Sequence, residues 1–113
     1  MTDQWLEWFD GLTAEEQDEL ASVIGLLERS GPHLPFPYSS KIAMSRHSHM
    51  RELRVQSKGR PFRTLYAFDP RRIAILLIGG DKTGNDRWYE EFVPRADDLY
   101  DEHLEILRKE GLI

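Results

Sequence analysis

The stretch from Lys41 to Lys82 constrains the fold more than any other part of the sequence. In residues 51–55 and 62–68, charged or small residues alternate with apolar ones, a pattern that predicts β-strands with one buried and one solvated face. Residues 73–78 are apolar throughout, which indicates a central strand covered on both faces. The short segments between these runs contain Gly, Ser, Asp and Pro. The sequence therefore predicts an antiparallel meander of three strands.

The same stretch carries a concentrated positive charge. Residues 41–72 contain nine Lys and Arg against two acids, a net charge of about +7, inside a chain whose formal net charge is −5. The acidic residues lie in the flanks, 1–40 and 73–113. A basic sheet between acidic flanks favours an anion-binding surface, and the alternative is a polarised surface that binds nothing.

Length and composition indicate one small domain covering residues 1–113, since 113 residues that are 40% hydrophobic can bury a single core. The chain has no cysteine, which excludes disulfides and thiolate chemistry. It shows no signal peptide and no apolar run near the roughly 20 residues that a membrane span needs. We therefore expect a cytoplasmic protein that does not bind membranes.

Two helices precede the predicted sheet. Apolar residues at helical spacing predict a short helix over residues 3–10, with Trp5 and Trp8 in the core. Residues 13–16 have the form of a capping box and open a second helix that ends near Arg29. The proline-rich residues 32–40 are expected to form an extended connection to the sheet.

A third helix is predicted at the C-terminus, over residues 94–109, with Pro94 in its first turn. Residues 87–93 fit either a strand or an earlier helical turn. We expect an α+β fold in which all three helices lie against one side of a small, mainly antiparallel sheet.

Two polar segments beside the sheet invite a functional interpretation. Residues 79–84 contain three glycines and Lys82 but lack the order of a phosphate-binding loop, so we expect the glycines to bend the backbone and direct Lys82 over the open face. His47 and His49 lie on one side of an extended segment. A metal site needs further ligands that the sequence does not supply convincingly, so we expect no metal and no cofactor.

Several short motifs together resemble one known family. They are ELR at 52–54, RxLY at 63–66, GGDK at 79–82, WYEE at 88–91 and ADDLYDEHL at 96–104. In this order, and over nearly the whole chain, they resemble the phage-derived, Gp49-like branch of the RelE/HigB toxin superfamily. The resemblance implies the toxin of a type II toxin–antitoxin system: a small α+β ribonuclease that cuts mRNA, commonly on the ribosome. Its implied protein partner is a cognate antitoxin, expected to contain a helix-turn-helix.

The resemblance also implies the site residues. Arg54 matches a basic residue on the catalytic face, Arg63 matches the arginine near the scissile phosphate, and Lys82 matches a lysine that follows the next strand. Tyr89 matches a tyrosine implicated in proton transfer. Further RNA contacts are expected from basic residues in and beside the meander: Arg46, His47, Arg51, Lys58, Arg60 and Arg87.

Strand geometry supports this assignment independently. Along residues 62–68, Arg63 and Leu65 point to one face, and Tyr66 and Phe68 point to the other, where they pack under the helices. Guanidinium and ammonium groups can stabilise a phosphorane without a metal ion, and a tyrosine or histidine can transfer protons. Two alternatives remain open. One is a catalytically weak module that binds RNA or protein through the basic face, and the other is an interaction protein whose aromatic N-terminal helices dock a second chain.

Overall fold

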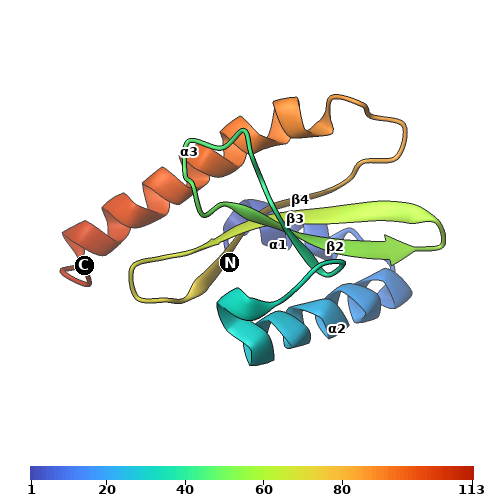
Figure 1. Cartoon of the computed structure of the whole chain (residues 1–113), viewed down its shortest axis with the longest axis horizontal. Helices are drawn as coiled ribbons and strands as arrows, with labels where there is room; N and C mark the ends of the chain where they lie inside the picture. Colours follow the sequence, from blue (N-terminus) through green and yellow to red (C-terminus); the bar gives the residue numbers. More distant parts are fainter.

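A computed structural model describes all residues from Met1 to Ile113 and shows a four-stranded sheet between helices (Figure 1). The elements follow in the order α1 (Asp3–Asp10), α2 (Ala14–Ser30), the 3-10 turn η1 (Gly31–His33), β1 (Ser39–Lys41), β2 (Arg51–Ser57), β3 (Arg60–Phe68), β4 (Ala74–Asp81) and α3 (Trp88–Lys109). The α+β class expected from the sequence is confirmed.

The sheet is an antiparallel meander in the order β1-β2-β3-β4, which confirms the three predicted strands. Lys58 and Gly59 connect β2 to β3 with φ angles of 51° and 79°. Positive φ at both central residues is the geometry of a tight two-residue hairpin. The prediction missed β1, because three residues are too few to show an alternating pattern. Pairing of β1 with β2 creates this strand.

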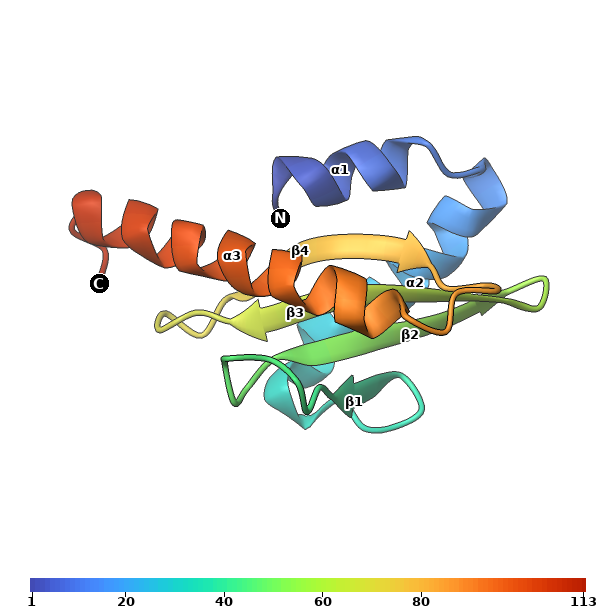
Figure 2. The same cartoon turned by 90° about the horizontal axis from the view of Figure 1, so that it is seen from above.

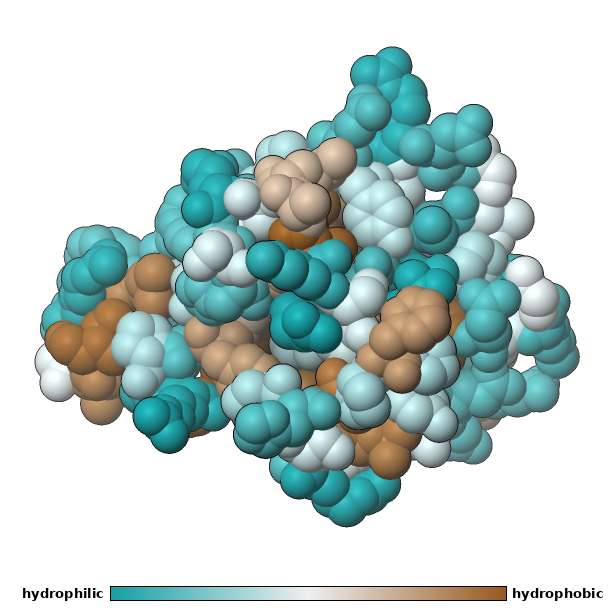
Figure 3. Space-filling model, viewed as in Figure 1, coloured by the Kyte–Doolittle hydropathy of each residue, from teal (hydrophilic) through white to brown (hydrophobic).

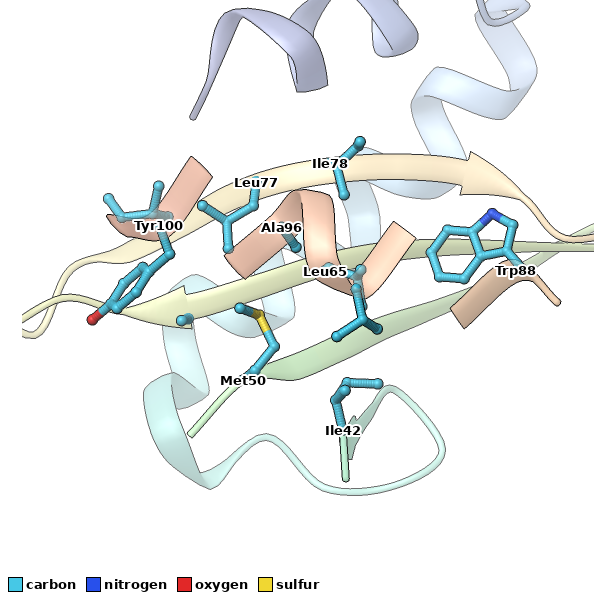
Figure 4. Close-up of a cluster of buried hydrophobic side chains, with 11 residues drawn as sticks. Ile42, Met50, Leu65, Leu77, Ile78, Trp88, Ala96 and Tyr100 are labelled. Atoms are coloured by element: carbon cyan, nitrogen blue, oxygen red, sulfur yellow. The ribbon is translucent and has the colours of Figure 1, made fainter. Parts of the chain in front are cut away.

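The helices cover both faces of the sheet, so the prediction that all three lie on one side is wrong (Figures 1 and 2). One face, which we call the α1/α2 face, carries a buried cluster of nine residues: Trp5, Leu20, Leu27, Leu34, Leu53, Val55, Phe62, Tyr66 and Leu76. The other, the α3 face, carries a cluster of eleven residues that includes Leu65, Leu77, Trp88 and Val93 (Figure 4). Because successive residues of β3 point to opposite faces and most are buried, both faces require a covering layer.

The N-terminal helices form as the sequence predicts. Thr13 Oγ1 accepts the backbone N–H of Glu16 at 3.2 Å, and Glu16 accepts the N–H of Thr13 at 2.8 Å, which completes the capping box. Trp5 is buried, and its indole N–H donates to Thr64 Oγ1 at 3.1 Å. The assignment of Trp5 to the core is confirmed.

The C-terminal helix begins at Trp88, six residues before the predicted start, and Pro94 lies inside it. Burial of Trp88 and Val93 against the sheet outweighs the single backbone hydrogen bond that a proline removes. Residues 88–93 are therefore helix, which places Tyr89 in the first turn of α3. None of the helices combines the length and the hydrophobicity that a membrane span requires.

Two glycines of β4 allow tryptophans to pack on both faces of the sheet. A Cβ atom on Gly79 would lie 2.2 Å from the Trp8 ring, and one on Gly80 would lie 2.7 Å from Trp88 Nε1. Both glycines belong to the regular strand rather than to a bend, which corrects the expectation for this segment. Because they have no side chain, these glycines let the two tryptophan rings approach the backbone of β4 closely.

Substitution of Gly79 tests this packing. Gly79→Ala forces Trp8 away from its edge-on contact with Phe62, and we expect it to lower the free energy of unfolding by about 1–3 kcal/mol. Gly25→Ala in α2 is the matched control, because its Cβ would meet only Arg29 Nη1 at 3.5 Å. It should stabilise the protein by about 0.5–1 kcal/mol. Urea denaturation measures both values, and equal effects of the two substitutions would contradict the packing account.

Candidate functional site

The four residues predicted to be catalytic converge on the α3 face. Arg54 in β2 lies directly opposite Arg63 in β3. Lys82 follows β4, and its Nζ lies 4.9 Å from the ring centroid of Tyr89, the second residue of α3. Strands β2 and β3, the segment after β4 and helix α3 thus each contribute one residue to the site.

A buried carboxylate, Glu52, lies at the centre of this group and is 5% exposed. Tyr89 donates its hydroxyl to Glu52 Oε1 at 2.6 Å, and Ser40 donates to Oε2 at 2.7 Å. Arg63 Nε lies 3.2 Å from Oε1, and Arg54 Nη1 lies 3.9 Å from Oε2. Since like charges opposite each other in a sheet repel, the carboxylate lets the two arginines stand side by side.

Arg63 is 5% exposed, so it does not project into open space as the strand pattern suggested. Its Nη1 donates to the carbonyl of Phe62 at 2.9 Å. The Nε–H makes an ion pair with Glu52 but no hydrogen bond of acceptable angle. Arg54 is more accessible, with 29% of its side chain exposed and its guanidinium 5.1 Å from the centroid of Phe36. Arg54 is therefore the arginine of the pair that solvent and ligands reach most easily.

The surroundings of Tyr89 keep its hydroxyl protonated. Burial raises the pKa of Tyr89 above its usual value of 10.0, and the hydrogen bond to Glu52 and the charge of that carboxylate raise it further. Arg63 acts in the opposite direction without cancelling these effects. At neutral pH, Tyr89 can donate a proton but is not a base.

Sequence reasoning missed Glu52 as a member of the site. It is the only acid in β2, two residues from Arg54 and hence on the same face. The sequence did offer a signal, a single acid between two arginines on a basic strand. The prediction used this acid only in the net charge of the segment.

A surface pocket of about 290 Å³ opens beside the Glu52–Tyr89 pair. Its other lining residues follow β1 or end it: Lys41, Ile42, Ala43 and Met44. Met44 is exposed and Ile42 is buried. The pocket thus combines an apolar wall with a carboxylate and a phenol at its base.

The six further residues expected to contact RNA all have polar partners within the protein. Four of them make ion pairs: Arg46 with Asp97, Asp98 and Asp101; Lys58 with Glu15; Arg60 with Glu16 and Asp81; and Arg87 with Glu90. His47 Nε2 lies 2.8 Å from Asp101 Oδ1. Arg51 donates to Ser39 Oγ at 2.9 Å on the α1/α2 face. Figure 3 shows hydrophilic side chains over most of the visible surface, interrupted by separate hydrophobic patches. Three of the nine basic residues of the meander, Arg46, Lys58 and Arg60, are thus matched by acids from the helices.

The two histidines of the sequence analysis do come together. The ring centroids of His47 and His49 are 5.9 Å apart, and His49 Nε2 lies 3.1 Å from the hydroxyl of Tyr100. His47 Nε2 instead contacts Asp101 at 2.8 Å. The chain contains no group of three or more His, Cys, Asp or Glu side chains placed to hold a metal ion.

Titration of Tyr89 tests the geometry of the site. We expect Glu52→Gln to lower the pKa of Tyr89, because the substitution removes the negative charge that opposes ionisation. The pKa of Tyr100 is also raised by burial, with a smaller contribution from Asp69, and should not respond to Glu52→Gln. NMR titration of ring-labelled tyrosine measures both groups in one sample. An unchanged pKa of Tyr89 would contradict its coupling to Glu52.

Comparisons with known proteins agree with the resemblance. The family model described as phage-derived protein Gp49-like (DUF891) matches residues 7–101. A Mycobacterium tuberculosis protein named "Putative toxin HigB2" is 42% identical over 99 residues, which cover 86% of this chain and 49% of that protein. Another from the same organism, "Putative toxin HigB3", is 45% identical over 91 residues, 80% of this chain and 78% of that protein.

The chain thus spans about half the length of the first of these relatives. No solved structure matches. The family model and both relatives extend over most of the chain, including the β2–β3 hairpin and the first turn of α3 that build the site, and the chain accordingly belongs to the Gp49-like family of phage-derived proteins.

Proposed function

We propose that this chain is the toxin of a type II toxin–antitoxin system and acts as a metal-independent endoribonuclease on mRNA at the ribosome. The observation that carries the proposal is the convergence of Arg54, Arg63 and Tyr89 on one buried carboxylate, with Lys82 over the ring of Tyr89. The names of the two mycobacterial relatives support the toxin class.

The site has the groups that metal-free RNA cleavage requires. Attack of a ribose 2′-hydroxyl on the adjacent phosphorus produces a phosphorane with two negative charges. Arg54, Arg63 and Lys82 supply fixed positive charge, and a guanidinium can contact two phosphate oxygens at once. Tyr89, kept protonated by burial and by Glu52, supplies an acid for the leaving oxygen.

The proposed protein partner is a cognate antitoxin, expected to contain a helix-turn-helix. The positive groups of the site favour an acidic or helical antitoxin segment laid across it, or close enough to block entry to the ribosome. Such binding would neutralise the toxin without any change in its fold.

One observation favours a second candidate, a module of the same fold that binds RNA or protein without cleaving it. Arg63 is almost fully buried and paired with Glu52, as a purely structural arginine would be. Such a module would bind RNA and leave it intact.

Cleavage by an Arg54 variant separates these candidates. Removal of a group aimed at developing charge commonly costs about 10²- to 10³-fold in rate, so Arg54→Ala should slow cleavage by that factor. The control is Arg108→Ala, which removes the same charge at an exposed position in the last turn of α3. This variant should cleave at the wild-type rate. The assay uses a short mRNA, free and on programmed ribosomes, and reads single-turnover rates.

The chemistry of the products tests the metal-independent mechanism in the same assay. Cleavage of the free mRNA should persist in EDTA, and the products on ribosomes, which need their Mg²⁺, should likewise carry a 2′,3′-cyclic phosphate or 3′-phosphate and a 5′-hydroxyl. A 5′-phosphate product that disappears with chelation would contradict the mechanism.

Arg63→Lys is preferable to Arg63→Ala, because loss of a buried partner of Glu52 costs about 3–5 kcal/mol and confounds activity with folding. Arg63→Lys should retain only part of the wild-type cleavage rate, since a lysine cannot contact two phosphate oxygens at once as a guanidinium can.

Growth assays test the toxin class. Induced expression of the chain should arrest growth and degrade mRNA, and coexpression of an adjacent antitoxin gene should restore both. The Arg54→Ala variant, expressed to the same level, should permit growth. Arrest by that variant with intact mRNA would favour the binding module.

A further inference from the structure

We propose that Glu52 is the general base that accepts the proton of the attacking 2′-hydroxyl and that Tyr89 is the acid that protonates the leaving 5′-oxygen. This inference rests on the proposed ribonuclease function and assigns its two proton transfers. It adds to the site a residue, Glu52, to which neither the motifs nor the relatives give a role.

Glu52 is the group of the site that can accept a proton. Arg54 and Arg63 are permanent donors, and a protonated Lys82 has no lone pair to offer. Glu52 Oε1 accepts from Tyr89, while Oε2 accepts from Ser40 and has Arg54 at 3.9 Å. A carboxylate oxygen has room for two hydrogen bonds, so Oε2 can accept a further donor on the side of Arg54.

Tyr89 is the matching acid. Its hydroxyl already donates at 2.6 Å, and its environment disfavours the phenolate, so the proton is present at neutral pH. Lys82 lies over the ring at 4.9 Å, where its charge can stabilise the phenolate that forms as the proton leaves.

The pocket beside the pair gives RNA a route to Glu52. Its polar base consists of Glu52 and Tyr89, and its wall of Ile42, Ala43 and Met44 suits the flat apolar surface of a nucleobase. A nucleoside seated there would bring its own 2′-hydroxyl toward the carboxylate. The site would thus hold the nucleotide on the 5′ side of the scissile phosphate.

The proton transfers balance within the pair. The 2′-oxygen forms its bond to phosphorus as its proton passes to Glu52, and the bond from phosphorus to the 5′-oxygen breaks as Tyr89 gives its proton to that oxygen. The products are a 2′,3′-cyclic phosphate and a 5′-hydroxyl. Solvent then takes the proton from Glu52 Oε2 and returns a proton to the Tyr89 phenolate, and the hydrogen bond from Tyr89 to Oε1 forms again.

A substrate with sulfur in place of the bridging 5′-oxygen separates the two roles, because a thiolate leaves without protonation. On ribosomes programmed with an mRNA that has one such linkage, Tyr89→Phe should cleave the sulfur substrate within about 10-fold of wild type. The same variant should be about 10²- to 10³-fold slow on the oxygen substrate. Glu52→Gln should be slow on both substrates. Glu91→Gln, an exposed acid in the first turn of α3, is the charge control and should match wild type on both.

Folding and RNA affinity are measured for every variant by thermal melting and by binding of a 2′-deoxy analogue that cannot be cleaved. If Glu52→Gln fails to fold, Glu52→Asp is used instead, because it keeps the negative charge beside Arg63 but moves the carboxylate oxygens away from the substrate. Its cleavage rate should be at least about 10-fold below wild type on both substrates. A folded Glu52 variant with wild-type rates overturns the base assignment. A Tyr89→Phe defect of equal size on both substrates overturns the acid assignment. Wild-type protein that binds both RNAs and cleaves neither overturns the ribonuclease proposal itself.

Discussion

The buried carboxylate of Glu52 is the interaction on which the arrangement of the site depends. It joins Ser40 of β1, Arg63 of β3 and Tyr89 of α3 to its own strand, so four elements meet at one side chain. Without this negative charge, Arg54 and Arg63 would face each other across neighbouring strands with their positive charges unopposed. A buried charge is tolerated only when its partners are in place, and this requirement fixes β1 and the first turn of α3 relative to the hairpin.

The second constraint is the two-sided sheet. A strand that is apolar on both faces cannot leave either face in water, so the chain needs a covering layer before and after the meander. The N-terminal helices provide one layer and α3 the other. Gly79 and Gly80 let both layers approach the sheet closely at the end of β4, because neither has a side chain where Trp8 or Trp88 packs. The end of β4, and with it Lys82, is held between these two contacts.

Electrostatics act differently at the surface and in the site. Arg46, Lys58 and Arg60, at the periphery of the meander, pair with acids contributed by α2, α3 and β4, which offsets part of the charge of about +7 on this segment. The site itself keeps two arginines beside one carboxylate, and a third cation, Lys82, lies over the ring of Tyr89. The excess of positive over negative charge at the site favours the approach of an anion there.

The sequence by itself determined the local structure: the capping box at Thr13, the hairpin at Lys58–Gly59, the alternation of β3 and the motifs that place the chain in its family. These features depend on neighbours in the chain or on a fixed period, so they can be read without a fold. Only the tertiary structure decided which helix covers which face, where α3 begins, which arginines are paired and which groups Glu52 contacts. These outcomes depend on contacts between residues far apart in sequence, such as Glu52 with Tyr89 and Arg46 with Asp101, whose partners no local pattern identifies.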